Sequence, residues 1–130
     1  MDIEQIVSDF NCTVQDFATN LAEICPETII GQNIKHFNKL INLKNNRYKF
    51  IEIFISKILQ YKDKIDKGDE SFFINKQYDT DLDNDKSLIN KVFEFQNIWQ
   101  KLSTKNKEFV IQYMQILCEL AQNYFLIKDQ

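Results

Sequence analysis

Apolar residues recur at alternating steps of four and three along the first 24 residues. This spacing places them on one side of an α-helix and predicts a helix that Pro26 ends, since proline cannot continue it. Thr13 and Asp16 have the spacing of a capping box, which predicts a restart or kink inside this helix. The row could be buried in its own domain or form a dimerisation seam, and burial is favoured. It consists of Ile3, Val7, Phe10, Val14, Phe17, Leu21 and Ile24.

The same periodicity predicts two helices in the next part of the chain. Residues 26–33 form a connector, and a short helix marked by apolar positions follows over 34–41. The polar stretch 43–47 interrupts it, with an asparagine as cap of the next helix. That next helix, over 48–59, carries apolar residues on two sides and is expected to be central.

A long polar connection over 67–85 comes next, and its aromatic segment 71–74 is expected to hold it against the core. Apolar residues at steps of four and three then predict a helix over 88–102. Ser103 is expected to cap the last helix. That helix has an apolar row of Val110, Tyr113, Leu117, Leu120, Ala121 and Tyr124, widened by Phe109, Met114 and Phe125.

These elements predict one all-α domain over 1–130, a compact bundle of about five helices with one long acidic loop. The 18 Ile residues favour strands, but the helical periodicity and the scarcity of turn residues, two Gly and one Pro, favour helices. The predicted common core contains Phe17, Leu21, Phe54, Ile58, Val92, Phe95, Trp99, Val110, Tyr113 and Leu117.

The cysteines and the N-terminus indicate a location inside the cell. Cys12, Cys25 and Cys118 are widely spaced and odd in number, which is typical of reduced thiols that serve as small buried apolar residues. The first residues are acidic and lack the features of a signal peptide. No apolar run approaches the roughly 18 residues of a membrane span, so we expect a soluble intracellular protein without a membrane partner.

The chain lacks the residue patterns of catalytic and cofactor sites. His36 is the single histidine, and it is expected at the rim of a short helix. One histidine excludes multi-histidine metal sites, and neither a P-loop nor a GxGxxG motif is present. We therefore expect no enzymatic activity, no catalytic residues, no cofactor and no metal.

The stretch Asp79–Asp85 has the alternating acids of a calcium-binding EF-hand loop. However, Asn84 occupies the position of the turn glycine, and Asn90 that of the bidentate glutamate. Lys86 replaces the apolar residue between them. We therefore expect a solvated acidic loop that binds no calcium.

Charge is distributed unevenly along the chain. Residues 1–30 carry a net charge of −6 and residues 31–67 carry +6, whereas the whole chain carries −3. A phosphate-binding stripe within 35–67 would contain Lys35, Lys39, Lys57 and Lys64. If the acidic helix packs beside this segment, the two fields cancel. Nucleic-acid binding is therefore the alternative hypothesis and not the favoured one.

Three short segments resemble uncharacterised short helical proteins of nucleocytoplasmic large DNA viruses, the mimivirus-like giant viruses. They are Cys25-Pro26-Glu27 after the first helix, Ser71-Phe72-Phe73, and Ile98 to Ser103 with the following Asn106, Lys107 and Tyr113. Cys25 stands where phenylalanine is usual, and Ile111 where tryptophan is common. The resemblance implies a helical fold and a place in the host cytoplasm or virus factory, and no known activity.

The favoured hypothesis is a non-enzymatic protein-interaction module. In a virus it would be an adaptor in infection or a small component of the virion or virus factory. Its partner would be a protein of unknown identity, and the chain itself would be a monomer or homodimer. The alternative is a nucleic-acid accessory protein that uses the basic segment 35–67.

Overall fold

A computed structural model describes residues 2–69, Trp99 and residues 101–128. All regular structure within these residues is helical, which confirms the all-α fold class. The α-helices are α1 (Ile3–Ile24), α2 (Ile29–Gln32), α3 (Ile34–Asn42), α4 (Lys49–Lys57), α5 (Lys62–Asp66) and α10 (Thr104–Lys128), with 3₁₀ turns η1 (Lys44–Asn46) and η2 (Leu59–Tyr61).

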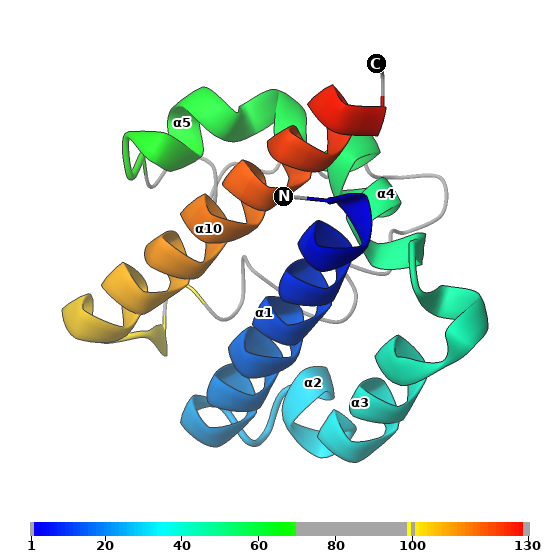
Figure 1. Ribbon diagram of the computed structural model, residues 1–130. Helices are drawn as coiled ribbons and strands as arrows, with labels where there is room; N and C mark the ends of the chain where they lie inside the picture. Colours follow the sequence, from blue (N-terminus) through cyan, green and yellow to red (C-terminus); the bar gives the residue numbers. More distant parts are fainter. Residues whose placement is uncertain (1, 70–98, 100, 129–130) are drawn as a thin grey trace.

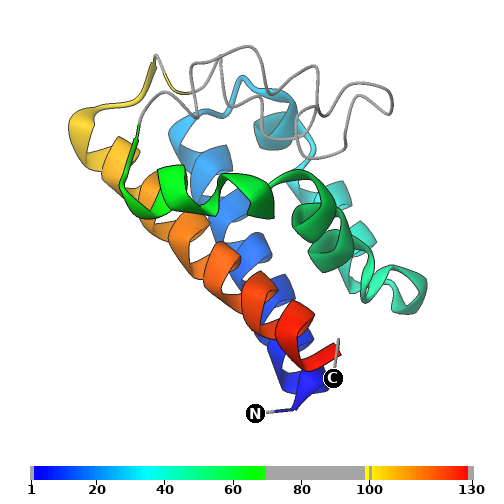
Figure 2. The ribbon, with the colours of Figure 1, turned by 90° about the horizontal axis from the view of Figure 1, so that it is seen from above.

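The long helices α1 and α10 lie side by side and antiparallel, so that the start of α1 and the end of α10 share one end of the molecule (Figures 1 and 2). Helices α2, α3 and α4 pack against α1, and α4 and α5 pack against α10. None of the described helices has the length and apolar character needed to cross a membrane.

Helix α1 begins at a cap and runs without a break. The backbone N–H of Gln5 donates to Asp2 Oδ1 at 2.7 Å, which satisfies a donor that the first helical turn leaves unpaired. Within the helix, the Thr13 hydroxyl donates to the carbonyl oxygen of Asp9 at 2.8 Å. The predicted restart at Thr13 is therefore wrong, because α1 is one helix through this position and the side chain bonds back to it instead of capping a new one.

The connector after Pro26 contains the short helix α2, which the periodicity did not predict. The buried Thr28 side chain donates to the carbonyl oxygen of Cys25 at 2.8 Å and accepts from the N–H of Gly31 at 3.1 Å. A Cβ at Gly31 would lie 2.6 Å from the carbonyl oxygens of Cys25 and Pro26. Glycine is therefore required for this tight turn.

The middle of the chain is more segmented than predicted. The short helix α3 and the interruption after it match the expectation. The helix predicted over 48–59, however, ends at Lys57, and η2 and α5 continue the chain. Gly68 then has a positive φ of 67°, which favours glycine, and its N–H donates to the carbonyl oxygen of Ile65.

The described core is one cluster of buried apolar side chains between α1, α10 and the middle helices. Phe10 of α1 meets Phe54 of α4 edge-to-face at 5.4 Å. Tyr113, predicted to be buried, is only partly so. The predicted core residues Val92 and Phe95 lie outside the described residues. Those found buried as predicted are Phe17, Leu21, Phe54, Ile58, Trp99, Val110 and Leu117.

Candidate functional site

The described side chains that could carry catalysis are scattered or shielded. In the part of the chain that the structure describes, no group of three or more His, Cys, Asp or Glu residues could hold a metal ion. His36 is exposed on α3, as expected for a surface residue.

The cysteines differ in their surroundings. Cys25 and Cys118 are buried as predicted, whereas Cys12 is exposed, contrary to the expectation of a buried thiol. Burial raises the pKa of the Cys118 thiol to about 12 and also raises the pKa of Cys25. Both thiols therefore remain protonated near neutral pH, and a thiol in that form is a poor nucleophile.

Two predicted features lie outside the described residues. These are the acidic stretch Asp79–Asp85, with the neighbouring Lys86 and Asn90, and the aromatic segment 71–74. The absence of a calcium site in this loop stays a prediction.

The four lysines of the predicted phosphate-binding stripe belong to three different helices. Lys35 and Lys39 are exposed on α3, Lys57 is partly buried on α4, and Lys64 is exposed on α5. Helices α3 and α5 lie far apart in the molecule (Figure 1). The structure therefore brings Lys35 and Lys39 together on one helix and does not join all four into one stripe.

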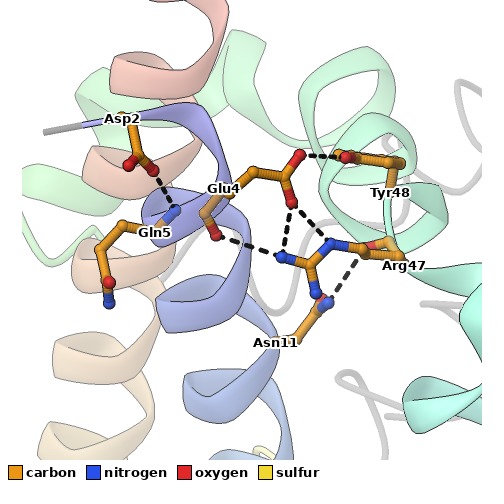
Figure 3. A network of polar contacts seen from close by, with 6 residues as sticks. All are labelled: Asp2, Glu4, Gln5, Asn11, Arg47 and Tyr48. Atoms are coloured by element: carbon orange, nitrogen blue, oxygen red, sulfur yellow. Dashed lines mark hydrogen bonds and ion pairs between the residues drawn. The ribbon is translucent and has the colours of Figure 1, made fainter.

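Glu4 at the start of α1 binds Arg47 and Tyr48, the two residues that precede α4 (Figure 3). Its carboxylate accepts a hydrogen bond from Arg47 Nε at 2.8 Å, and Arg47 Nη2 lies 2.6 Å from the same oxygen. The Tyr48 hydroxyl donates to the other carboxylate oxygen. Asn11 Nδ2 donates to the carbonyl oxygen of Arg47 at 2.9 Å, so two turns of α1 hold this segment.

This network changes the charge balance at one end of α1. The hydrogen bond from Tyr48, followed by that from Arg47, lowers the pKa of Glu4. The hydrogen bond that Arg47 donates to Glu4 raises the pKa of Arg47. The acidic first helix and the basic segment do lie side by side, and at this point one acid neutralises one base.

On α10, four large side chains form a row at steps of four, three and four residues, which places them on one side of the helix. We call this set the α10 row. Two members are exposed, Phe109 by 46% and Ile116 by 48%, and the other two are partly buried. The row consists of Phe109, Tyr113, Ile116 and Leu120.

The α10 row lies on the side of α10 that faces α1. The Tyr113 ring stacks on Phe17 of α1, with ring centres 5.0 Å apart and planes 17° apart. The Tyr113 hydroxyl accepts a hydrogen bond from Asn20 Nδ2. Because the helices are antiparallel, Ile24, one turn beyond Asn20, lies towards Phe109, one turn before Tyr113. Ile24 is also exposed, so apolar side chains of both helices reach solvent here. We call this surface of α1 and α10 the shared face.

Two hollows lie elsewhere on the described surface. One, of about 340 Å³, lies between α4 and α10 and includes Ile55 and Phe125 in its lining. The Lys128 ammonium there lies 2.9 Å from a carboxylate oxygen of Glu52, so its charged groups neutralise each other. The other, of about 220 Å³, lies between α1 and the α3–η1 segment and includes the exposed Cys12.

The sequence pattern predicted that Phe109 and Phe125 widen the buried side of the last helix, so it did not indicate that Phe109 belongs to an exposed row. Both are nearly half exposed. A signal was present: apolar residues occur on more sides of this helix than a single core contact can cover. Such a surplus indicates a surface for a partner, but it does not identify which side is free.

Comparison with models of known protein families, with curated proteins and with solved structures finds no match for this chain. The function is therefore argued from the geometry and chemistry of the described residues.

Proposed function

We propose that this protein is a non-enzymatic protein-interaction module whose binding surface is the shared face of α1 and α10. The supporting observation is the exposure of Phe109 and Ile116 within the continuous α10 row. Single exposed apolar residues are ordinary on protein surfaces, whereas adjoining ones mark contact sites for other molecules.

The residue types in this face suit a protein contact. Aromatic side chains are enriched where protein interfaces are buried, and a few of them supply most of the binding energy. Phe109 and Tyr113 are of this type, and Tyr113 is held in place by Phe17 and Asn20. A side chain that is already ordered loses less conformational freedom on binding.

A finer assignment rests on the sequence resemblance to giant-virus proteins. On that basis the module is an adaptor in viral infection, or a small component of the virion or virus factory. Its location would then be the host cytoplasm or the virus factory. Fluorescence microscopy of the labelled protein in infected cells tests this proposed location separately.

The experiment that tests the proposed function compares proteins captured by three forms of the full chain. These are the wild type, the face variant Phe109→Ser/Ile116→Ser, and a control variant Leu43→Ser/Leu126→Ser. The control removes two apolar side chains that are 52% and 53% exposed and are not members of the α10 row. Captured proteins are quantified by mass spectrometry from the cells in which the chain acts.

We expect the face variant to lose its specific partner by roughly tenfold or more, because truncation of central interface residues weakens binding by that order. The control variant is expected to retain the partner. Equal capture by the wild type and the face variant would overturn the proposed function. Circular dichroism of all three forms establishes that each is folded.

A further inference from the structure

The charges beside the α10 row identify the kind of partner that the shared face fits. Helix α1 carries acids at steps of seven residues, which places them in one row along its outer side. We call this set the acidic ridge. No Lys or Arg occurs among residues 1–30, so α1 has no base of its own to neutralise them. The acidic ridge consists of Asp9, Asp16 and Glu23.

The acidic ridge lies along the α10 side of α1. Asn20 contacts Tyr113 of α10, and Asp16 is one helical turn before Asn20. Asp16 and Glu23 are exposed, and within the described residues their side chains have no hydrogen-bond or ion-pair partner. By contrast, Glu4, on another side of α1, is engaged by Arg47. The shared face therefore consists of the apolar α10 row and, beside it on α1, the acidic ridge.

We propose that this face binds a basic amphipathic helix of a partner protein, an inference that rests on the proposed function. The α10 row spans the 12 residues from Phe109 to Leu120, or about 17 Å along the helix axis, which matches about three turns of a partner helix. Apolar residues of the partner, at steps of three and four, pack on the row. Lysine or arginine residues on one flank of the same helix face Asp16 and Glu23, so the pattern selects both the partner and its orientation.

A second copy of this chain fits the face less well. If two α10 rows packed on each other, each acidic ridge would face the other copy's α10 or α1. The exposed flank of α10 beyond the row carries one base, Lys105, and one acid, Glu119, so its formal net charge is zero. The ridge would then gain no net opposite charge. Nucleic acids and anionic membranes are negatively charged, so the acidic ridge repels them.

The test measures binding of labelled synthetic helices to the full chain by fluorescence anisotropy. The first peptide, about 18 residues long, has leucines at steps of three and four and lysines along one flank. The second replaces those lysines with glutamates, and the third has the first peptide's composition in scrambled order. Each is titrated at about 50 and 200 mM salt. Analytical ultracentrifugation records the oligomeric state of the chain alone.

Variants of the chain test the acidic ridge and the α10 row separately. The ridge variant Asp16→Lys/Glu23→Lys reverses the charge of two residues of the acidic ridge. The face variant Phe109→Ser/Ile116→Ser removes the two exposed apolar side chains of the α10 row. The matched control Asp63→Lys/Glu108→Lys makes the same change in net charge on α5 and on the side of α10 remote from Tyr113. All the substituted side chains are exposed.

We expect the wild type and the matched control to prefer the lysine peptide to the glutamate peptide by at least roughly tenfold. The ridge variant should reverse this preference, and the face variant should weaken binding of the lysine peptide. Equal binding of the scrambled peptide, or an unchanged preference in the ridge variant, would overturn the inference. A stable homodimer that buries Ile116 would overturn it as well.

Failure of this inference is distinguishable from failure of the proposed function. If captured partners depend on Phe109 and Ile116 but the lysine peptide does not bind, the face is an interaction site for a different chemistry. If capture does not depend on these two residues, the proposed function itself is wrong, whatever the peptides do.

Discussion

Two aromatic side chains near the start of α10 differ in environment, and this difference gives a test of the packing at the scale of single residues. Trp99 is 2% exposed, whereas Phe109 is 46% exposed. We expect Trp99→Ala to lower the free energy of unfolding by about 3–5 kcal/mol, because it leaves a cavity in the core. Phe109→Ala should lower it by less than about 1 kcal/mol. Urea denaturation measures both, and a loss below about 1 kcal/mol for Trp99→Ala would contradict the described core.

The carboxylate of Glu4 gives a second residue-scale prediction, in the pH dependence of stability. Its pKa is lowered below the ordinary value of 4.5, first by the hydrogen bond from Tyr48 and then by that from Arg47. A carboxyl group with a lowered folded-state pKa stabilises the fold above its unfolded pKa, and this contribution disappears as pH falls through the folded value. The stability difference between wild type and Glu4→Gln should therefore exist above about pH 4.5 and shrink below it.

Urea denaturation over a pH series measures this difference, and NMR titration measures the pKa of Glu4 directly. Glu23→Gln serves as the control, because Glu23 is exposed and is not part of the Arg47 network. The control should show no comparable change of stability between neutral and acidic pH. A difference for Glu4→Gln that grows as pH falls would contradict the assigned sign.

At the scale of elements, the start of α10 depends on a cap. The N–H of Asn106 donates to Ser103 Oγ at 3.2 Å, as the sequence predicted for a capping serine. Ser103→Ala should lower the free energy of unfolding by about 1 kcal/mol, because it leaves a helix donor unpaired. Ser103→Asn should restore most of it. Ser8→Ala, at an exposed position inside α1, is the control and should change stability by at most about 0.5 kcal/mol.

The elements that could be predicted from sequence are those whose signals are local. Pro26 ends α1 through its own ring, and Ser103 caps α10 through its own hydroxyl. The restart at Thr13 was wrong because a threonine can either cap a helix or bond to a carbonyl one turn back. Its sequence spacing is the same in both cases, so the surrounding helix decides.

The candidate site was predictable only in part, because exposure depends on which helices cover α10. Periodicity indicated an amphipathic last helix, and it placed Val110 and Leu117 in the core. It could not show that α1 covers one flank of Tyr113 and leaves Ile116 nearly half exposed. The four lysines do not form one stripe for a related reason. They are close in the sequence, but the turns η1 and η2 between them direct α3, α4 and α5 to different parts of the molecule.

At the scale of the whole molecule, charge cancels at one end of α1 and not along its length. Arg47 neutralises Glu4 where the basic segment meets α1. The acidic ridge lies on another side of the same helix, so proximity of the two segments in the fold leaves it free for a partner. The contact with the basic segment and the acidic ridge thus lie on different sides of α1.

This arrangement leads to a prediction about nucleic acids, the alternative partner class. Lys35 and Lys39 are on α3, far from Lys64 on α5, and Arg47 is already bound by Glu4. A phosphate backbone that reached both α3 and α5 would have to cross a molecule whose net charge is −3. We therefore expect no submicromolar binding of double- or single-stranded DNA or RNA at physiological salt.

Fluorescence anisotropy at about 50 and 200 mM salt measures this, and its salt dependence identifies the contacts. Each phosphate contact would weaken binding by roughly 0.9 log unit for each tenfold rise in salt, so a converging stripe would give a steep slope. A shallow slope and weak binding are expected instead. Tight binding with a steep slope, lost when Lys35, Lys39, Lys57 and Lys64 become Glu but kept when Lys105 becomes Glu, would favour the nucleic-acid hypothesis over the interaction module. In that event the acidic ridge would face away from the bound strand, since it would repel the phosphates.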